Sequence, residues 1–364
     1  MFRKSAPPTT AKDDVVITDS APCQKSLRLH VATTTIAPVR AAVLAEFQRQ
    51  TTLPGFRKGK APTELIERQY AQAIQDEALQ RVTKHTFEQV TKTHQLKPVG
   101  PFEVSAADFT EAEGLTLQAT VEVEPNFAMG TYKGIALPAT TVDVTPEELQ
   151  SALTKLQESM AQLVPVGPGE TKERTVPALD NELAKDLGFQ DLETMKNHVR
   201  AKLLEQKRDA QRRTQEAALF DELLQRHTFE VPPRLVSRQT ERLTRDFTTR
   251  LLMAGTPEEK LPEETAKFAE QLRTSAERHV KLGFIFERIA DAESVTVTQD
   301  EIVGRLWELS QRWKKDPAEV RRYFDAQGLW PSVISTIRQE KTVALILAAA
   351  SINGATTATS ARRP

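Results

Sequence analysis

The chain has 364 residues, a length typical of two or three domains with well-formed hydrophobic cores. Its formal net charge of -1 excludes a protein drawn to nucleic acid by overall charge, so any contact with RNA depends on a local basic cluster. Cys23 is the sole cysteine, which excludes an intramolecular disulfide and favours a reducing compartment.

The two ends of the chain carry no targeting or membrane pattern. Residues 1–22 are polar and contain Pro7 and Pro8, a composition that predicts a disordered extension without the apolar core of a secretory signal. The longest apolar run, Val343 to Ile352, is about half as long as a membrane span and predicts a buried helix. Residues 354–364 are of low complexity and predict a disordered tail.

Residues 23–128 predict an α+β domain. An alternating apolar pattern over residues 23–34 predicts a strand, and apolar residues at helical spacing follow it as far as Phe47. Pro62 suits the first turn of a second, long helix. That helix carries one apolar stripe, made of Ile66, Tyr70, Ile74, Ala78, Val82 and Val90. Two further strands, near residues 102–104 and 115–124, complete the domain.

A basic loop separates the two predicted helices. It consists of Gly55, Phe56, Arg57, Lys58, Gly59 and Lys60. The glycines permit turn conformations that project the aromatic and basic side chains into solvent, where they suit a phosphate-rich partner that also offers a base or an apolar surface. The alternative is an ordinary solvated loop. A nucleotide-binding loop is excluded, because only three residues separate the glycines and Ala61 follows the last lysine.

Residues 129–164 predict a linker followed by a helix. Thr145 and Glu148 have the spacing of a capping box at the start of that helix. Residues 165–175 continue a segment rich in proline and glycine, which predicts a short connector.

Residues 176–353 predict a helical domain. A leucine-rich stripe over residues 192–224 indicates a very long helix, Pro232 and Pro233 end it, and a second stripe covers residues 235–251. Further helix starts are marked by Pro262, Thr298 with Glu301, Asp316 with Pro317, and Pro331.

No catalytic or metal-binding pattern emerges from the residue types. The six histidines lack the paired spacing of metal ligands, and nothing in the sequence marks a base beside Cys23, which is predicted to lie in a strand. Met160, Met195 and Met253 are predicted to pack in cores, with contacts to a flexible client as the alternative. The sequence therefore predicts no cofactor and no catalytic residue.

The string from Gly55 to Pro62, followed at the same spacing by Ile66 and Tyr70, resembles the signature loop of trigger factor, a family of bacterial ribosome-associated chaperones. The resemblance implies that the loop docks beside the exit tunnel of the large ribosomal subunit, on a ribosomal protein and nearby rRNA. It also implies an elongated, multidomain fold, with an α+β ribosome-binding domain over residues 23–128 and a mostly α-helical C-terminal chaperone domain with helical arms over residues 176–353.

Family members usually carry an FKBP-like prolyl isomerase domain of roughly 100 residues where this chain has residues 165–175. The segment is too short for such a domain, so we expect it to be missing. The resemblance further implies nascent and unfolded polypeptides as partners, no membrane and, away from the ribosome, a homodimer.

The prediction from the sequence is an ATP-independent, cytoplasmic chaperone that docks at the ribosomal exit tunnel and is not an enzyme. Three alternatives remain open. They are a periplasmic chaperone of the SurA type, an active peptidyl-prolyl isomerase as the family label suggests, and an rRNA-binding assembly factor without chaperone activity.

Overall fold

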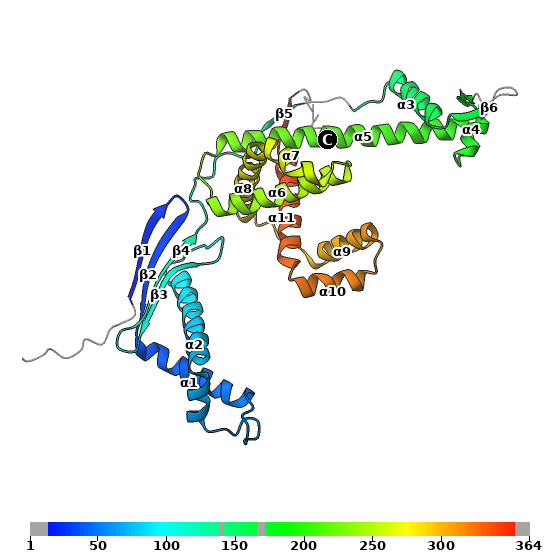
Figure 1. Ribbon diagram of the computed structural model, residues 1–364. Helices are drawn as coiled ribbons and strands as arrows, with labels where there is room; N and C mark the ends of the chain where they lie inside the picture. Colours follow the sequence, from blue (N-terminus) through cyan, green and yellow to red (C-terminus); the bar gives the residue numbers. More distant parts are fainter. Residues whose placement is uncertain (1–13, 139–141, 166–171, 354–364) are drawn as a thin grey trace, which may run out of the picture. The chain divides into compact units, whose positions relative to one another are not determined.

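The computed structural model describes residues 14–138, 142–165 and 172–353 (Figure 1). Contacts divide the chain into two compact units. One holds the described residues up to Met129 together with His227–Ile285, and the other holds Gly130–Arg226 together with the described residues from Phe286 onward.

The first unit is built on a four-stranded antiparallel sheet in the order β1-β2-β4-β3. The strands are β1 (Asp14–Ala21), β2 (Gln24–Val31), β3 (Glu103–Thr110) and β4 (Gly114–Glu122). On one face of the two central strands, Leu29 lies opposite Leu117 and Val31 lies opposite Leu115, and all four side chains are buried. Because side chains alternate between the faces of a strand, this register gives the sheet one continuous apolar face.

Two helices build the core of this unit with the sheet, α1 (Thr33–Gln50) and α2 (Thr63–Thr93). The predicted stripe of α2 is confirmed, since every member except Tyr70 is buried. Its C-terminal part packs on the sheet and its N-terminal part packs on α1. Tyr70 has non-helical backbone angles, φ -120° and ψ 23°, and kinks the helix where its ring packs 6.2 Å from that of Phe47.

The first unit also contains the start of the C-terminal helices. These are α6 (Pro233–Met253), a short 3₁₀ turn, α7 (Leu261–Lys267) and most of α8 (Ala269–Ala292). The buried carboxylate of Glu122 accepts a hydrogen bond of 2.8 Å from the backbone N–H of Arg234 in the first turn of α6. A negative group is favourable there because the free N–H groups of a helix start carry partial positive charge. Arg234 also forms an ion pair with Glu103.

The second unit is mostly helical and is organised along α5 (Leu192–Arg226), the predicted very long helix. Its other helices are α3 (Pro146–Ser159), α4 (Asn181–Asp186), α9 (Gln299–Trp313), α10 (Pro317–Gln327) and α11 (Trp330–Ala348). The predicted capping box at Thr145 is confirmed, and the predicted helix start at Thr298 is also a capping box. Glu148 donates its N–H to the Thr145 hydroxyl at 3.3 Å and accepts from the Thr145 N–H at 2.9 Å, and Thr298 and Glu301 repeat the pattern.

Short strands complete the second unit. β5 (Ala136–Pro138) pairs in parallel with β8 (Ser351–Asn353), and β6 (Gln162–Pro165) pairs antiparallel with β7 (Lys172–Thr175). The predicted helix over Val343 to Ile352 is therefore right only as far as Ala348. The sequence predicts an α+β N-terminal part and a mostly helical C-terminal part, and that fold class is confirmed.

Three expectations differ from the structure. The predicted disordered extension contains β1, because pairing with β2 supplies ordered partners that a local pattern cannot reveal. Cys23 lies in the turn between these strands, with a φ of 57°, and is not a strand residue. The predicted helical domain over residues 176–353 is divided between the two units, because Glu122 and Glu103 hold the start of α6 against the sheet. The predicted tail, 354–364, lies outside the described residues.

One glycine carries a strong packing constraint. Gly114, at the start of β4, has a φ of +94°, and a Cβ placed there would lie 2.2 Å from the carbonyl oxygen of Val31. We expect Gly114→Ala to lower the free energy of unfolding of this unit by about 2–4 kcal/mol, because backbone strain adds to a clash that no rotamer relieves. Hydrogen exchange of the β2 and β4 amides measures this directly.

Gly255→Ala is the matched control. Gly255 has a φ of +87° in the same unit, and nothing lies within 4 Å of its Cβ position. The control should cost only about 1 kcal/mol, confined to the end of α6. Equal exchange rates of the sheet amides in the two variants would contradict the assignment of Gly114 to close backbone packing.

Candidate functional site

The basic loop of residues 55–60 consists of two consecutive turns. The N–H of Phe56 donates to the carbonyl of Leu53 at 3.0 Å, and the N–H of Lys60 donates to the carbonyl of Arg57 at 2.9 Å. In each turn the third residue is a glycine with positive φ, +86° at Gly55 and +76° at Gly59. A type II turn requires that conformation at this position, so the glycines are needed for the shape of the loop.

Buried residues on either side hold the loop in place. Leu53 and Ala61 belong to a core cluster with Val43 of α1 and Ile66 of α2. The side-chain amide of Gln48 donates to the carbonyl of Ala61 at 2.7 Å. Both ends of the loop are therefore fixed by packing and hydrogen bonding.

Ion pairs also join α1 to α2. Arg40 contacts Glu67 at 2.6 Å, and Arg81 contacts Glu46 at 2.8 Å. The hydrogen bonds from Arg81 lower the pKa of the Glu46 carboxyl, so this pair is charged over the neutral pH range. The loop lies where the two helices meet, at the end of the pair away from the sheet (Figure 1).

The side chains at the tip are presented to solvent. Phe56 is 39% exposed, which is unusual for a phenylalanine, and Arg57, Lys58 and Lys60 are exposed as well. No acidic side chain in the described residues forms an ion pair with these three cations. The arrangement offers one aromatic face and three positive charges on a fixed backbone.

The structure thus brings together all six residues predicted for the site, Gly55 to Lys60. Sequence reasoning missed the residues that hold them, namely Leu53, Ala61 and Gln48. The available signal was the apolar pair Leu53 and Ala61 on either side of a polar loop, because such residues need a core to cover them.

Among the described residues, the cysteine, histidine and methionine candidates form no catalytic or metal site. Cys23 donates its thiol to the carbonyl of Glu230 at 3.2 Å, and burial together with Glu230 and Glu122 raises its pKa, which makes it a poor nucleophile. In the described ranges, no three His, Cys, Asp or Glu side chains are placed to hold a metal ion. Met195 is buried as predicted, whereas Met253 is 84% exposed and does not pack in a core.

None of the helices in the described ranges combines the length and the apolar character that crossing a bilayer requires.

Similar proteins of known family align with this chain over most of its length. The trigger factor of Anaeromyxobacter dehalogenans (strain 2CP-C) is 26% identical, with 91% of this chain and 98% of that protein aligned. The trigger factor of Solibacter usitatus (strain Ellin6076) is 22% identical, over 89% and 96% of the two chains. The first alignment runs over 421 positions, more than the 364 residues of this chain, so that relative contains residues without a counterpart here.

A solved structure of the trigger factor chaperone, described for its promiscuous substrate recognition in folding and assembly, has a similar fold. The TM-score is 0.51 at 17% identity, covering 92% of this chain and 99% of that one.

Two family models match separate parts of the chain. Residues 14–156 match the model described as bacterial trigger factor protein, and residues 191–348 match the model of the bacterial trigger factor C-terminus. Together these segments span most of the described residues, including the loop, and the chain belongs to the trigger factor family.

Proposed function

We propose that this protein is an ATP-independent, cytoplasmic chaperone that docks through the loop of residues 55–60 at the exit tunnel of the large ribosomal subunit. There it holds nascent and unfolded polypeptides. The observation that carries the proposal is the fixed, solvent-exposed loop with Phe56, Arg57 and Lys58 at its tip.

The loop chemistry supports docking on a surface made of rRNA and protein. Guanidinium and ammonium groups bind phosphate oxygens, and an exposed ring stacks on a base or fills an apolar pocket. With a net charge of -1, the rest of the chain adds no general attraction to RNA, so binding depends on this one site.

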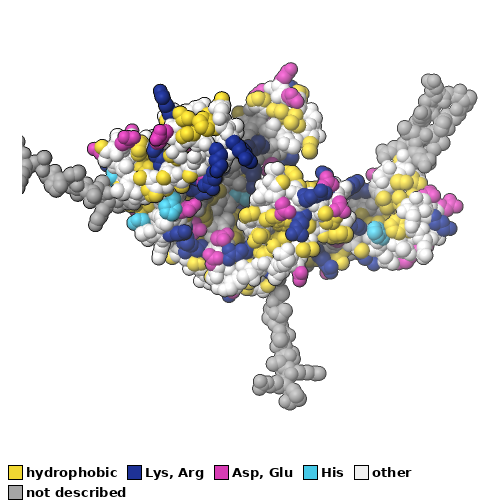
Figure 2. Space-filling model, turned by 90° about the horizontal axis from the view of Figure 1, so that it is seen from below, with side chains coloured by type: hydrophobic (Ala, Val, Ile, Leu, Met, Phe, Trp, Pro, Cys, Tyr) yellow, Lys and Arg dark blue, Asp and Glu magenta, His cyan; other side chains and the backbone are white. Residues whose placement is uncertain are grey.

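Exposed apolar side chains support the binding of unfolded clients. Several lie on or between the helices after residue 250. Figure 2 shows apolar side chains interspersed with basic ones over the face in view. They are Leu252, Met253, Phe268, Val303, Trp307, Trp313, Tyr323 and Ile334. Large exposed apolar groups are costly in water unless a partner covers them, and an unfolded chain offers the matching apolar surface.

The region between α3 and α4 supports a role without prolyl isomerisation. β6 and β7 pair directly, with Pro165 opposite Lys172, and six residues join them. A hairpin of this size has no core of its own, whereas an isomerase needs a preformed apolar pocket.

Docking would act through effective concentration. A chaperone held at the tunnel exit meets each emerging segment at high local concentration, so weak and reversible contacts are enough. Covering apolar segments gives intramolecular burial time to compete with aggregation. Release then follows from fast dissociation and needs no nucleotide.

The test combines two assays on the full chain. The protein should co-sediment with ribosomes and should suppress aggregation of a chemically unfolded client at stoichiometric amounts, with or without ATP. Ribosome binding without suppression would favour an rRNA-binding assembly factor instead. Suppression without ribosome binding would remove the docking role, and a dependence on ATP would contradict the release mechanism.

A further inference from the structure

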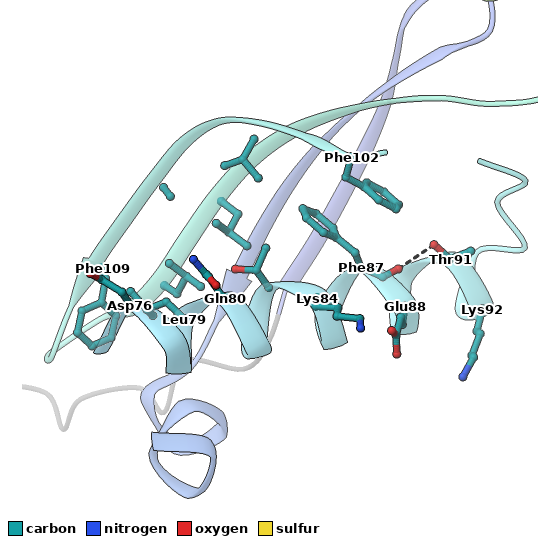
Figure 3. Close-up of a pocket in the computed structure, with 15 residues that line it drawn as sticks. Asp76, Leu79, Gln80, Lys84, Phe87, Glu88, Thr91, Lys92, Phe102 and Phe109 are labelled. Atoms are coloured by element: carbon teal, nitrogen blue, oxygen red, sulfur yellow. Dashed lines mark hydrogen bonds between the residues drawn. The ribbon is translucent and has the colours of Figure 1, made fainter. Parts of the chain in front are cut away.

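The sheet of the first unit has an uncovered apolar groove that the docking loop does not use. It lies between α2 and the strands β3 and β4 and has a volume of about 880 Å³. Figure 3 shows α2 along one side of the groove, with Phe87 and Phe102 stacked at one end and Phe109 at the other. The stacked rings are 4.2 Å apart.

The register of the sheet explains why the groove is apolar. Three β4 residues of the core each have a β3 residue directly opposite. The pairs are Leu115 with Phe109, Leu117 with Ala107, and Ala119 with Val104. The β3 members therefore lie on the same face of the sheet as the core. Among the described residues, the β3 part of that face is only partly covered. Val104 is consequently 44% exposed and Ala107 is exposed, although both point to the core side of the sheet.

The edge of the sheet next to the groove is open. β3 is the last strand in the order β1-β2-β4-β3, so half of its backbone N–H and C=O groups have no strand partner within the described sheet. An extended segment can pair with this edge while every second side chain enters the groove.

The charges at the rim indicate the kind of occupant. Four exposed charged residues of α2 line the groove, Asp76 and Glu88 with Lys84 and Lys92. Two negative and two positive groups balance, so the site complements a segment without net charge and gives no attraction to RNA. This distinguishes it from the loop, whose charged groups are all positive.

We propose that the groove binds an uncharged, extended stretch of an unfolded client, which adds to β3 as a fifth strand and places alternate apolar side chains against Phe87, Phe102 and Phe109. Val104 to Phe109 span about 17 Å at the rise of a strand, which corresponds to five to seven client residues. The inference rests on the proposed chaperone function and gives it a second binding surface, in the unit that carries the loop.

Other occupants fit less well. Residues 1–13 suit the groove less well, because they contain Arg3, Lys4 and Lys12 and because Pro7 and Pro8 have no N–H to donate to an edge strand. A second copy of the chain is the remaining candidate. The experiment below distinguishes the client from residues 1–13 and from a second copy.

The test uses a fluorescein-labelled, end-capped heptapeptide in which Phe and Val alternate with Thr and Ser. We expect saturable binding by fluorescence anisotropy that changes less than about twofold when salt is raised. Val104→Glu should weaken it about tenfold or more, because the new carboxylate would be buried beside the bound segment. Val16→Glu is the matched control, since Val16 is 49% exposed on β1, at the other edge of the same sheet. The affinity of the Val16→Glu variant for the peptide should equal that of the wild type.

A second measurement does not depend on a variant. The same peptide with a benzophenone in place of one Phe should form photo-crosslinks to β3 and α2. Crosslinks confined to α6–α11, equal affinity in the two variants, or no saturable binding would overturn the proposal. So would a tenfold gain in affinity on deleting residues 1–13, which assigns the groove to that segment. Loss of binding as the protein dimerises would assign it to a second copy.

The experiments distinguish a failure of the groove proposal from a failure of the proposed chaperone function. If the groove binds nothing, the full-length protein can still suppress aggregation through other surfaces, and Val104→Glu then suppresses as well as the wild type. If the proposed chaperone function is wrong, the wild-type protein does not suppress aggregation, whether or not it binds the heptapeptide.

Discussion

Replacing Phe56, Arg57 and Lys58 together with alanine should reduce ribosome affinity at least about a hundredfold, because one stacked ring and two cations each contribute roughly 1–3 kcal/mol to such an interface. The salt dependence of the remaining binding should also flatten, by about one unit of the log–log slope for each lost phosphate contact. Co-sedimentation with ribosomes at several salt concentrations measures both effects.

The fold should be unaffected by this change, since the tip side chains are exposed and the loop is held by Leu53 and Ala61. The free energy of unfolding is expected to stay within about 0.5 kcal/mol of the wild-type value. A matched control replaces Arg321, Arg322 and Tyr323 of α10, which are also two cations and one aromatic, all exposed. Equal losses in the two triple variants would mean that the docking role belongs to general charge and not to the loop.

The second large effect is a separation of chaperone activity from prolyl isomerisation. The protein should suppress aggregation at stoichiometric amounts, yet leave the slow, proline-limited refolding phase of a client at its uncatalysed rate. The barrier of that step is roughly 18–20 kcal/mol, and lowering it requires a folded pocket around the bond. The β6–β7 hairpin occupies the segment where the family resemblance implies that domain, and it is too small to supply such a pocket.

Refolding kinetics of a proline-limited client, with a known prolyl isomerase as positive control, measure this directly. A proline-free client should be protected equally well, because we propose that the protein recognises exposed apolar surface. Acceleration of the slow phase at substoichiometric amounts would falsify the proposal and would place an isomerase site elsewhere in the chain.

Local patterns were sufficient to predict much of this protein. The buried stripe of α2 and the capping boxes at Thr145 and Thr298 follow from residues a few positions apart, so the sequence alone contains the information. The same holds for the loop, where glycines at fixed positions specify two tight turns. The sequence thereby determined which side chains the proposed docking loop presents.

The tertiary structure decided what depends on distant partners. β1 forms because β2 lies beside it, and β5 pairs with β8 although Ala136 and Ser351 lie far apart in the chain. Glu122 reaches the start of α6, which places that helix with the sheet. The groove over β3 exists because α2 covers only part of the apolar face. Which faces meet, and which stay open, is set by long-range packing, and a pattern of neighbouring residues contains no information about it.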